Sequence, residues 1–128
     1  MPEDLWGDLK SVPVLRTPLT VLKEQAQLLS TKMDRVIEGR VSSEHGDEGT
    51  VHTLSIYAPT LSYTVQVLSL WHDIDLYPVD VIYLLDRDED DETECANEEQ
   101  LLEALRAKLS HASVRRVISS LLSQIAAA

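Results

Sequence analysis

The densest group of potential metal ligands in the chain is an acidic run at residues 86–94. Three aspartates at its start have the alternate spacing of the oxygen ligands that open a calcium loop: Asp86, Asp88 and Asp90. The sixth position is Asp91 instead of the glycine that the sharp turn needs, and the twelfth is Asn97 instead of a bidentate glutamate. The spacing therefore predicts a solvated connection and no specific metal site.

The same run suits long-range attraction better than coordination. Closely spaced carboxylates create a negative potential that draws a basic surface toward them, and salt screens this attraction over about 10 Å at 0.1 M. The residues expected to steer a basic partner are Asp88, Glu89, Asp90, Asp91 and Glu92.

The histidines offer no clear ligand set. His72 is followed by Asp73 and Asp75, but alternate residues of a strand face opposite ways, so these side chains cannot easily converge on one ion. The other histidines lack a partner four residues away on a helix: His45, His52 and His111. We expect neither a metal nor another cofactor.

Nucleophilic catalysis has equally little support. Cys95 is the only cysteine, and its acidic neighbours raise the pKa of a thiol and weaken its thiolate character. No serine has a spacing that places a base beside it. We therefore expect no enzymatic activity. A lone cysteine also predicts that the chain has no internal disulfide and favours a reducing compartment.

Charge and hydropathy restrict the partners further. The 128 residues carry a formal charge of −11, which repels phosphate backbones and acidic lipids. The apolar runs are too short to span a bilayer, and the N-terminus lacks the basic flank of a signal peptide. We expect a cytoplasmic protein that binds no nucleic acid and no membrane. Its partner would be another protein, basic in character, or a second copy of the chain.

Aromatic side chains on the predicted strands supply the sharpest functional hypothesis: Tyr57, Tyr63, Trp71 and Tyr83. Each shares a strand face with aliphatic residues, and such mixed patches anchor many protein interfaces. If these residues share the sheet face away from the helices, they form a partner-binding patch. The alternative is that they complete the core or are covered by the N-terminal segment that carries Trp6.

Periodicity predicts the elements that position these residues. Thr17 and Pro18 form a helix start, and a stripe of apolar residues from 22 to 36 predicts a helix that packs on the core. Four strands follow, joined by short turns, at residues 37–44, 50–58, 61–72 and 76–85. The last two have apolar residues on both faces, a pattern that a sheet with one face in water does not need.

Two helices close the chain. Asn97 and Gln100 form a capping pair for the first, and residues 110–113 separate it from a last amphipathic helix. Because short turns make strands antiparallel, the predicted class is α+β, with a four-stranded antiparallel meander sheet, one N-terminal helix and two C-terminal helices (α-β-β-β-β-α-α). Three parts are expected: a segment that packs on the domain (1–16), the domain (17–125) and a tail of possible vector origin (126–128).

These patterns favour a non-enzymatic interaction domain that binds a protein partner or itself through an apolar and aromatic sheet face. A small-molecule module is the alternative. In that case the cup between sheet and helices accepts an apolar compound, which His52, His72 or Gln66 orients. An enzyme ranks third.

Overall fold

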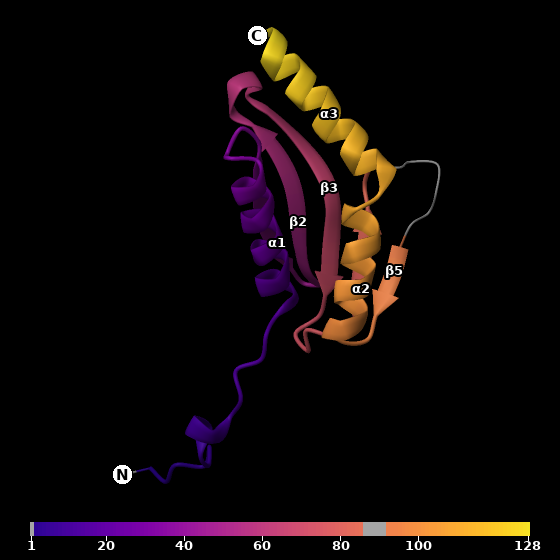
Figure 1. Cartoon of the computed structure of the whole chain (residues 1–128). Helices are drawn as coiled ribbons and strands as arrows, with labels where there is room; N and C mark the ends of the chain where they lie inside the picture. Colours follow the sequence, from indigo (N-terminus) through magenta and orange to yellow (C-terminus); the bar gives the residue numbers. More distant parts are fainter. Residues whose placement is uncertain (1, 86–91) are drawn as a thin grey trace.

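A computed structural model describes residues 2–85 and 92–128 of the chain. Within this part of the chain it confirms the α+β class, with a five-stranded antiparallel meander sheet in the order β1-β2-β3-β4-β5. One α-helix precedes the sheet and two follow it (Figure 1). The elements are η1 (Leu9–Ser11), α1 (Pro18–Lys32), β1 (Glu38–Gly46), β2 (Gly49–Ala58), η2 (Pro59–Leu61), β3 (Tyr63–His72), β4 (Val79–Tyr83), β5 (Glu92–Cys95), α2 (Glu98–Leu109) and α3 (Ala112–Ala127).

The described part of the sheet has one strand more than the predicted four. The additional strand, β5, pairs with β4 and lies at the end of the acidic run, where closely spaced carboxylates hide its alternating pattern. Cys95 is buried on the helix side, whereas Glu92 and Glu94 are exposed. Of the predicted steering residues, Glu92 begins this strand, and residues 88–91 lie outside the described residues, as does Asp86.

The third and fourth strands are shorter than predicted. β3 begins at Tyr63, after the 3-10 helix η2. Ser62 connects the two elements and has a left-handed backbone conformation, with φ 50°. β4 begins at Val79, because Pro78 has no backbone N–H to donate to a neighbouring strand.

The first helix is held against the first strand by a close backbone approach. Thr17 caps the helix as predicted, by accepting a hydrogen bond from the backbone N–H of Thr20. Further along, a Cβ atom at Gly39 would lie 2.5 Å from the Cα of Ala26, so only glycine allows the strand to come this close. Ser30 closes the contact, because its Oγ accepts from the Gly39 N–H (2.9 Å) and donates to the Ala26 carbonyl (3.1 Å).

The core lies between the helices and the sheet face that they cover (Figure 1). Its largest fully buried side chains include Leu22, Ile37, Ile56, Leu68, Leu70 and Leu101. We call the opposite face of the sheet the outer face. Helix α1 contacts β1 and β2, while α2 contacts β4 and β5.

A bulge in β3 corrects the prediction that this strand is apolar on both faces. Leu68 lies opposite Leu54 on β2, and Val65 lies opposite Ile56. The register therefore shifts between these two pairs, and no residue of β2 lies opposite Val67. Val65, Val67 and Leu68 all contribute to the core. Apolar residues at both odd and even positions therefore lie on the helix side, because the strand changes phase at the bulge.

The N-terminal segment does not pack on the domain as predicted. Trp6 is 78% exposed, and residues 2–16, which we call the arm, run away from the body of the protein (Figure 1). At the other end of the chain, Ala126 and Ala127 continue helix α3. In the described part of the chain, no helix combines the length and apolarity that a membrane crossing needs.

Candidate functional site

The structure separates the four aromatic residues predicted to bind a partner. Tyr57 and Trp71 lie on the outer face, whereas Tyr63 and Tyr83 lie on the helix side. On the outer face Trp71 is opposite Val51, which is six residues from Tyr57 along β2, so about 20 Å separates the two positions. The β2 residues between these positions whose side chains are also on the outer face are Thr53 and Ser55. The described outer face therefore has no continuous aromatic patch.

Tyr83 belongs to the core. Its side chain is buried, and its ring and the His111 ring form an edge-to-face contact with 5.7 Å between centroids. The ammonium group of Lys108 lies 5.5 Å from the centre of the same ring. A partner cannot reach Tyr83 without opening the core.

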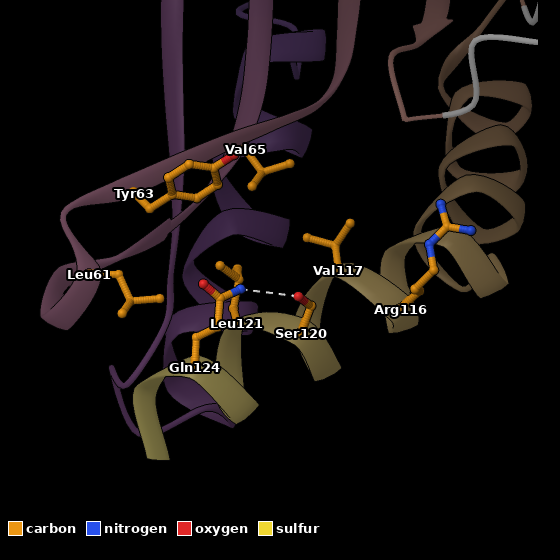
Figure 2. Close-up of a pocket in the computed structure, with 8 residues that line it drawn as sticks. All are labelled: Leu61, Tyr63, Val65, Arg116, Val117, Ser120, Leu121 and Gln124. Carbon is orange, nitrogen blue, oxygen red and sulfur yellow. Dashed lines mark hydrogen bonds between the residues drawn. The ribbon is translucent and has the colours of Figure 1, made fainter. Parts of the chain in front are cut away.

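Tyr63, by contrast, lines a groove between β3 and helix α3 and is 57% exposed (Figure 2). The groove has a volume of about 630 Å³. Its lining comes from η2, β3 and α3, and consists of Leu61, Tyr63, Val65, Arg116, Val117, Ser120, Leu121 and Gln124. A cavity of this size, with an apolar floor and a few polar groups, is typical of a binding site.

The groove lies beside an open stretch of strand. β4 pairs with β3 only from Leu68 to His72, and the backbone N–H of Leu84 then donates to the carbonyl of Val67 (2.9 Å). Beyond that point no described strand pairs with residues 63–66 on the side away from β2. We call this stretch the open edge. Backbone groups on such an edge can pair with an incoming extended segment.

The side chains around the open edge divide into an apolar floor and a polar rim. Val65 from the strand and Val117 from the helix point into the groove (Figure 2). On the rim, the Nε2 of Gln124 donates to the Oγ of Ser120 (3.2 Å). Arg116 places a positive charge at the groove, although the chain as a whole is acidic.

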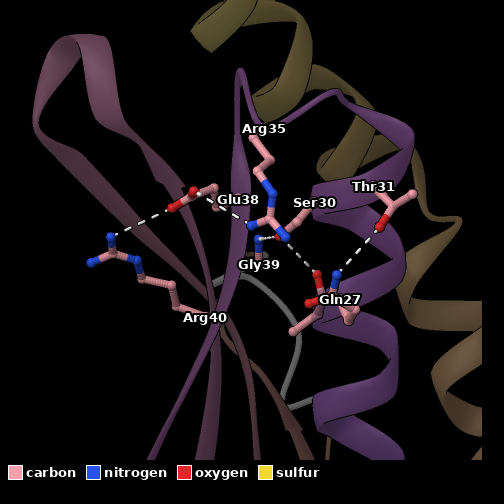
Figure 3. A network of polar contacts seen from close by, with 8 residues as sticks. Gln27, Ser30, Thr31, Arg35, Glu38, Gly39 and Arg40 are labelled. Atoms are coloured by element: carbon pink, nitrogen blue, oxygen red, sulfur yellow. Dashed lines mark hydrogen bonds and ion pairs between the residues drawn. The ribbon is translucent and has the colours of Figure 1, made fainter.

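On the outer face Tyr57 is already engaged within the chain. The guanidinium carbon of Arg40 lies 3.7 Å from the centre of its ring, a cation–π arrangement. Arg40 also forms an ion pair with Glu38 (3.5 Å), and Glu38 contacts Arg35 (3.9 Å) (Figure 3). These exposed contacts cover one face of the Tyr57 ring, which lowers its value as an anchor for a partner.

A second, smaller cavity corresponds to the predicted cup between sheet and helices. It lies between α1 and α3, has a volume of about 220 Å³, and is floored by Leu54, Ile56 and Val67. The residues predicted to orient a ligand are elsewhere. His52 and His72 are not part of its lining, and Gln66 is exposed on β3 opposite Ser55.

Sequence patterns do not predict a buried chain of hydrogen bonds that joins two histidines. Ser43 Oγ lies 2.6 Å from Nδ1 of His52, and the Nε2 atoms of His52 and His72 are 2.9 Å apart. Nδ1 of His72 lies 2.6 Å from the carbonyl of Asp73. Because a carbonyl only accepts, His72 donates through Nδ1. When the His72 ring carries only this proton, its Nε2 accepts from Nε2 of His52, whose Nδ1 then accepts from the Ser43 hydroxyl.

Ser43, His52 and His72 are connected in the same order as the serine, the base and the orienting group of a nucleophilic triad. Burial, followed by the nearby charges of His72, His45 and Lys23, lowers the pKa of His52 to about 4. A histidine with so low a pKa is a weak general base at neutral pH. The chain therefore satisfies two buried imidazoles and gives no support for catalysis.

The remaining candidate ligands and nucleophiles stay apart. Burial, with Asp80 and Glu94 nearby, raises the pKa of the Cys95 thiol, so the thiolate is disfavoured. Among residues 2–85 and 92–128, no group of three or more histidine, cysteine, aspartate or glutamate side chains is arranged to hold a metal ion.

Comparisons with known proteins give no relative for this chain: no family model, no curated protein and no solved structure matches it.

Proposed function

We propose that this protein is a non-enzymatic interaction domain that binds an extended apolar segment of another protein chain. The bound segment pairs with the open edge of β3 as an added strand, and its alternate side chains enter the groove. The observation that carries this proposal is the position of the open edge directly beside the groove under α3. Addition of a strand to a sheet edge is a general mode of peptide recognition.

Both halves of the contact contribute to affinity. Backbone hydrogen bonds to the open edge contribute roughly 1 kcal/mol each. An apolar side chain that contacts Tyr63, Val117 and Leu121 can contribute roughly 1.5–3 kcal/mol when it is fully buried. Alternate residues of the added strand face the groove, so the partner needs small or medium apolar residues at every second position.

The other long edge of the sheet, β1, is less suitable. Its side chains include Glu38, Arg40 and Glu44, and charged residues on an edge strand discourage pairing with another chain. Glycines also occur at its second and last positions, Gly39 and Gly46. The open edge of β3 has no charged side chain between residues 63 and 66.

Charge adds selectivity at longer range. A chain with a net charge of −11 attracts a basic partner, and the steering residues predicted from the sequence act in the same sense. Arg116 has the opposite sign and favours a carboxylate next to the apolar residues of the bound segment. A docking segment that carries an acidic residue beside its apolar residues therefore suits the groove, whether it belongs to a basic protein or to a second copy of this chain.

The proposal can be tested with an acetylated six-residue peptide of alternating valine and threonine. Titration of the isotope-labelled chain should shift the backbone amide resonances of residues 63–66 and of Val117. A Val117→Asp variant, which places a carboxylate on the groove floor, should show much smaller shifts. Shifts confined to β1 or to the outer face around Trp71 would contradict the proposal.

A small-molecule function is the second candidate, and the cavity between α1 and α3 favours it. Leu28, Leu29 and Ile118 line this cavity together with residues of the sheet, so it suits a compact apolar compound. An apolar compound that binds there should raise the melting temperature, and a Leu29→Phe variant, which fills the space, should remove that effect.

A further inference from the structure

We infer that the segment bound at the open edge is residues 12–15 of a second copy of this chain, so that two copies exchange their arms. This inference rests on the proposed function and names its partner.

The arm exposes an unusual amount of apolar surface. Its large apolar side chains are all more than half exposed: Leu5, Trp6, Leu9, Val12, Val14 and Leu15. Val14 is 100% exposed. Isolated exposed apolar residues are common, but a run of this kind marks a surface that another molecule covers.

The last part of the arm has the shape of an incoming strand. Val12 is extended, with φ −68° and ψ 124°, and the residues from there to Thr17 form no helix. Val12 and Val14 are alternate residues, so both face the same way when the segment pairs with β3. Pro13 lies between them, and proline is tolerated on an edge strand with its nitrogen toward solvent.

The position of the arm favours a second copy over the same chain. Arg16 fixes the root of the arm, because it forms ion pairs with Glu24 on α1 and with Glu98 at the start of α2 (2.6 Å to the latter). The arm leaves the end of the molecule opposite the C-terminus of α3, whereas the groove contains Gln124 near that C-terminus (Figure 1). Strand β3, at ten residues, separates the two ends by about 30 Å.

Charge complementarity supports the same match. The arm carries acidic residues before the apolar segment, Glu3, Asp4 and Asp8, while Arg116 of α3 lines the groove. When residues 12–15 occupy the groove, the acidic part of the arm passes Arg116. Two copies related by a two-fold axis can make this contact twice.

Light scattering on the full chain tests the inference. We expect a concentration-dependent dimer, and we expect Val14→Asp on the arm and Val117→Asp in the groove each to raise the dimer dissociation constant at least tenfold. Ile74→Asp is the matched control, because Ile74 is 94% exposed and lies outside both surfaces. That variant should leave the dimer unchanged.

Mixing the two disrupted variants gives a sharper result. Val14→Asp keeps an intact groove and Val117→Asp keeps an intact arm, so an equimolar mixture should recover one of the two arm–groove contacts and form a heterodimer. If Val117→Asp melts at a lower temperature than the wild type, Tyr63→Ser replaces it, because Tyr63 is largely exposed. A wild-type dimer that Val14→Asp does not weaken would overturn the inference.

A peptide of residues 9–16, added to the full-length Val14→Asp chain, separates failure of the inference from failure of the proposed function. If the wild type is monomeric but this peptide shifts the amides of residues 63–66, the open edge accepts the arm sequence but no second copy supplies it, so the inference fails and the proposed function stands. If only the valine–threonine peptide binds there, the inference fails and the proposed function stands. If neither peptide binds at the open edge, both fail.

Discussion

His52 and His72 meet through their Nε2 atoms at 2.9 Å, and both side chains are buried. Only one proton fits between the two nitrogens, so the two rings cannot both carry a proton at Nε2, and the contact excludes the state in which both rings are charged. Ser43, the Asp73 carbonyl, His45 and Lys23 are the other polar or charged groups near the pair.

The first prediction is that acid weakens the fold through this pair. The pKa of His52 is about 4 in the folded chain against an ordinary value of 6.5, so between these values the unfolded chain binds more protons. The free energy of unfolding should therefore rise with pH across this window, by up to about 3 kcal/mol from this group. Urea unfolding at pH 4.5 and 7 measures the difference.

His52→Gln should flatten this part of the pH dependence. His45→Gln should reduce the pH dependence by a smaller amount, because His45 is exposed and only its charge acts on the pKa of His52. An unchanged pH dependence in His52→Gln would show that other groups cause it.

The second prediction concerns the contact between α1 and β1. Gly39→Ala places a Cβ atom 2.5 Å from the Ala26 Cα, which is backbone and cannot move aside cheaply. We expect a loss of about 1–3 kcal/mol in the free energy of unfolding. Gly46→Ala on the same strand is the matched control, because the nearest atom to its new Cβ is 3.9 Å away. Equal stabilities of the two variants would contradict the close packing.

The third prediction distinguishes Tyr63 from Tyr83, which the sequence analysis places together as partner-binding residues. Tyr83→Ser should cost about 3–5 kcal/mol of stability, because it empties a core position. Tyr63→Ser should change stability by less than about 1 kcal/mol and yet weaken binding of the valine–threonine peptide. Melting curves and peptide titrations on both variants measure these effects. A strongly destabilised Tyr63→Ser would make Tyr63 a core residue instead of a groove residue.

Local signals predict much of the fold correctly. Thr17 and Pro18 start α1, and the Asn97 side chain accepts from the backbone N–H of Gln100 (2.9 Å) to cap α2. The alternation of β2 also gives the correct buried face, with Leu54 and Ile56 in the core. Caps and alternation depend on neighbouring residues, so they can be read from the sequence.

Features that depend on strand register or strand length cannot be predicted from neighbouring residues in the sequence. The shift around Val67 changes which side chains of β3 are buried, and no residue type marks it. His52 and His72 meet only because of the hairpin register. The groove depends on how early β4 stops pairing with β3, and Pro78 gives only the other end of that strand.

The fourth prediction concerns salt. If acidic residues of the arm pass Arg116, the Arg116→Gln substitution should weaken the dimer more at 0.05 M salt than at 0.5 M, because salt screens exposed charge pairs. The comparison is between wild type and variant at each salt concentration, because salt also screens the repulsion between two chains of charge −11. An equal effect of Arg116→Gln at both salt concentrations would remove the electrostatic part of the contact and leave the apolar part.

Amide hydrogen exchange in residues 63–66 shows whether a strand is added to the open edge, because alternate N–H groups of this stretch point away from β2. We expect these outward amides to exchange slowly in the wild type at a concentration that favours the dimer and fast in Val14→Asp, and to regain protection when that variant binds the valine–threonine peptide. Fast and unchanged exchange at these amides under all three conditions would show that the open edge of β3 accepts no added strand.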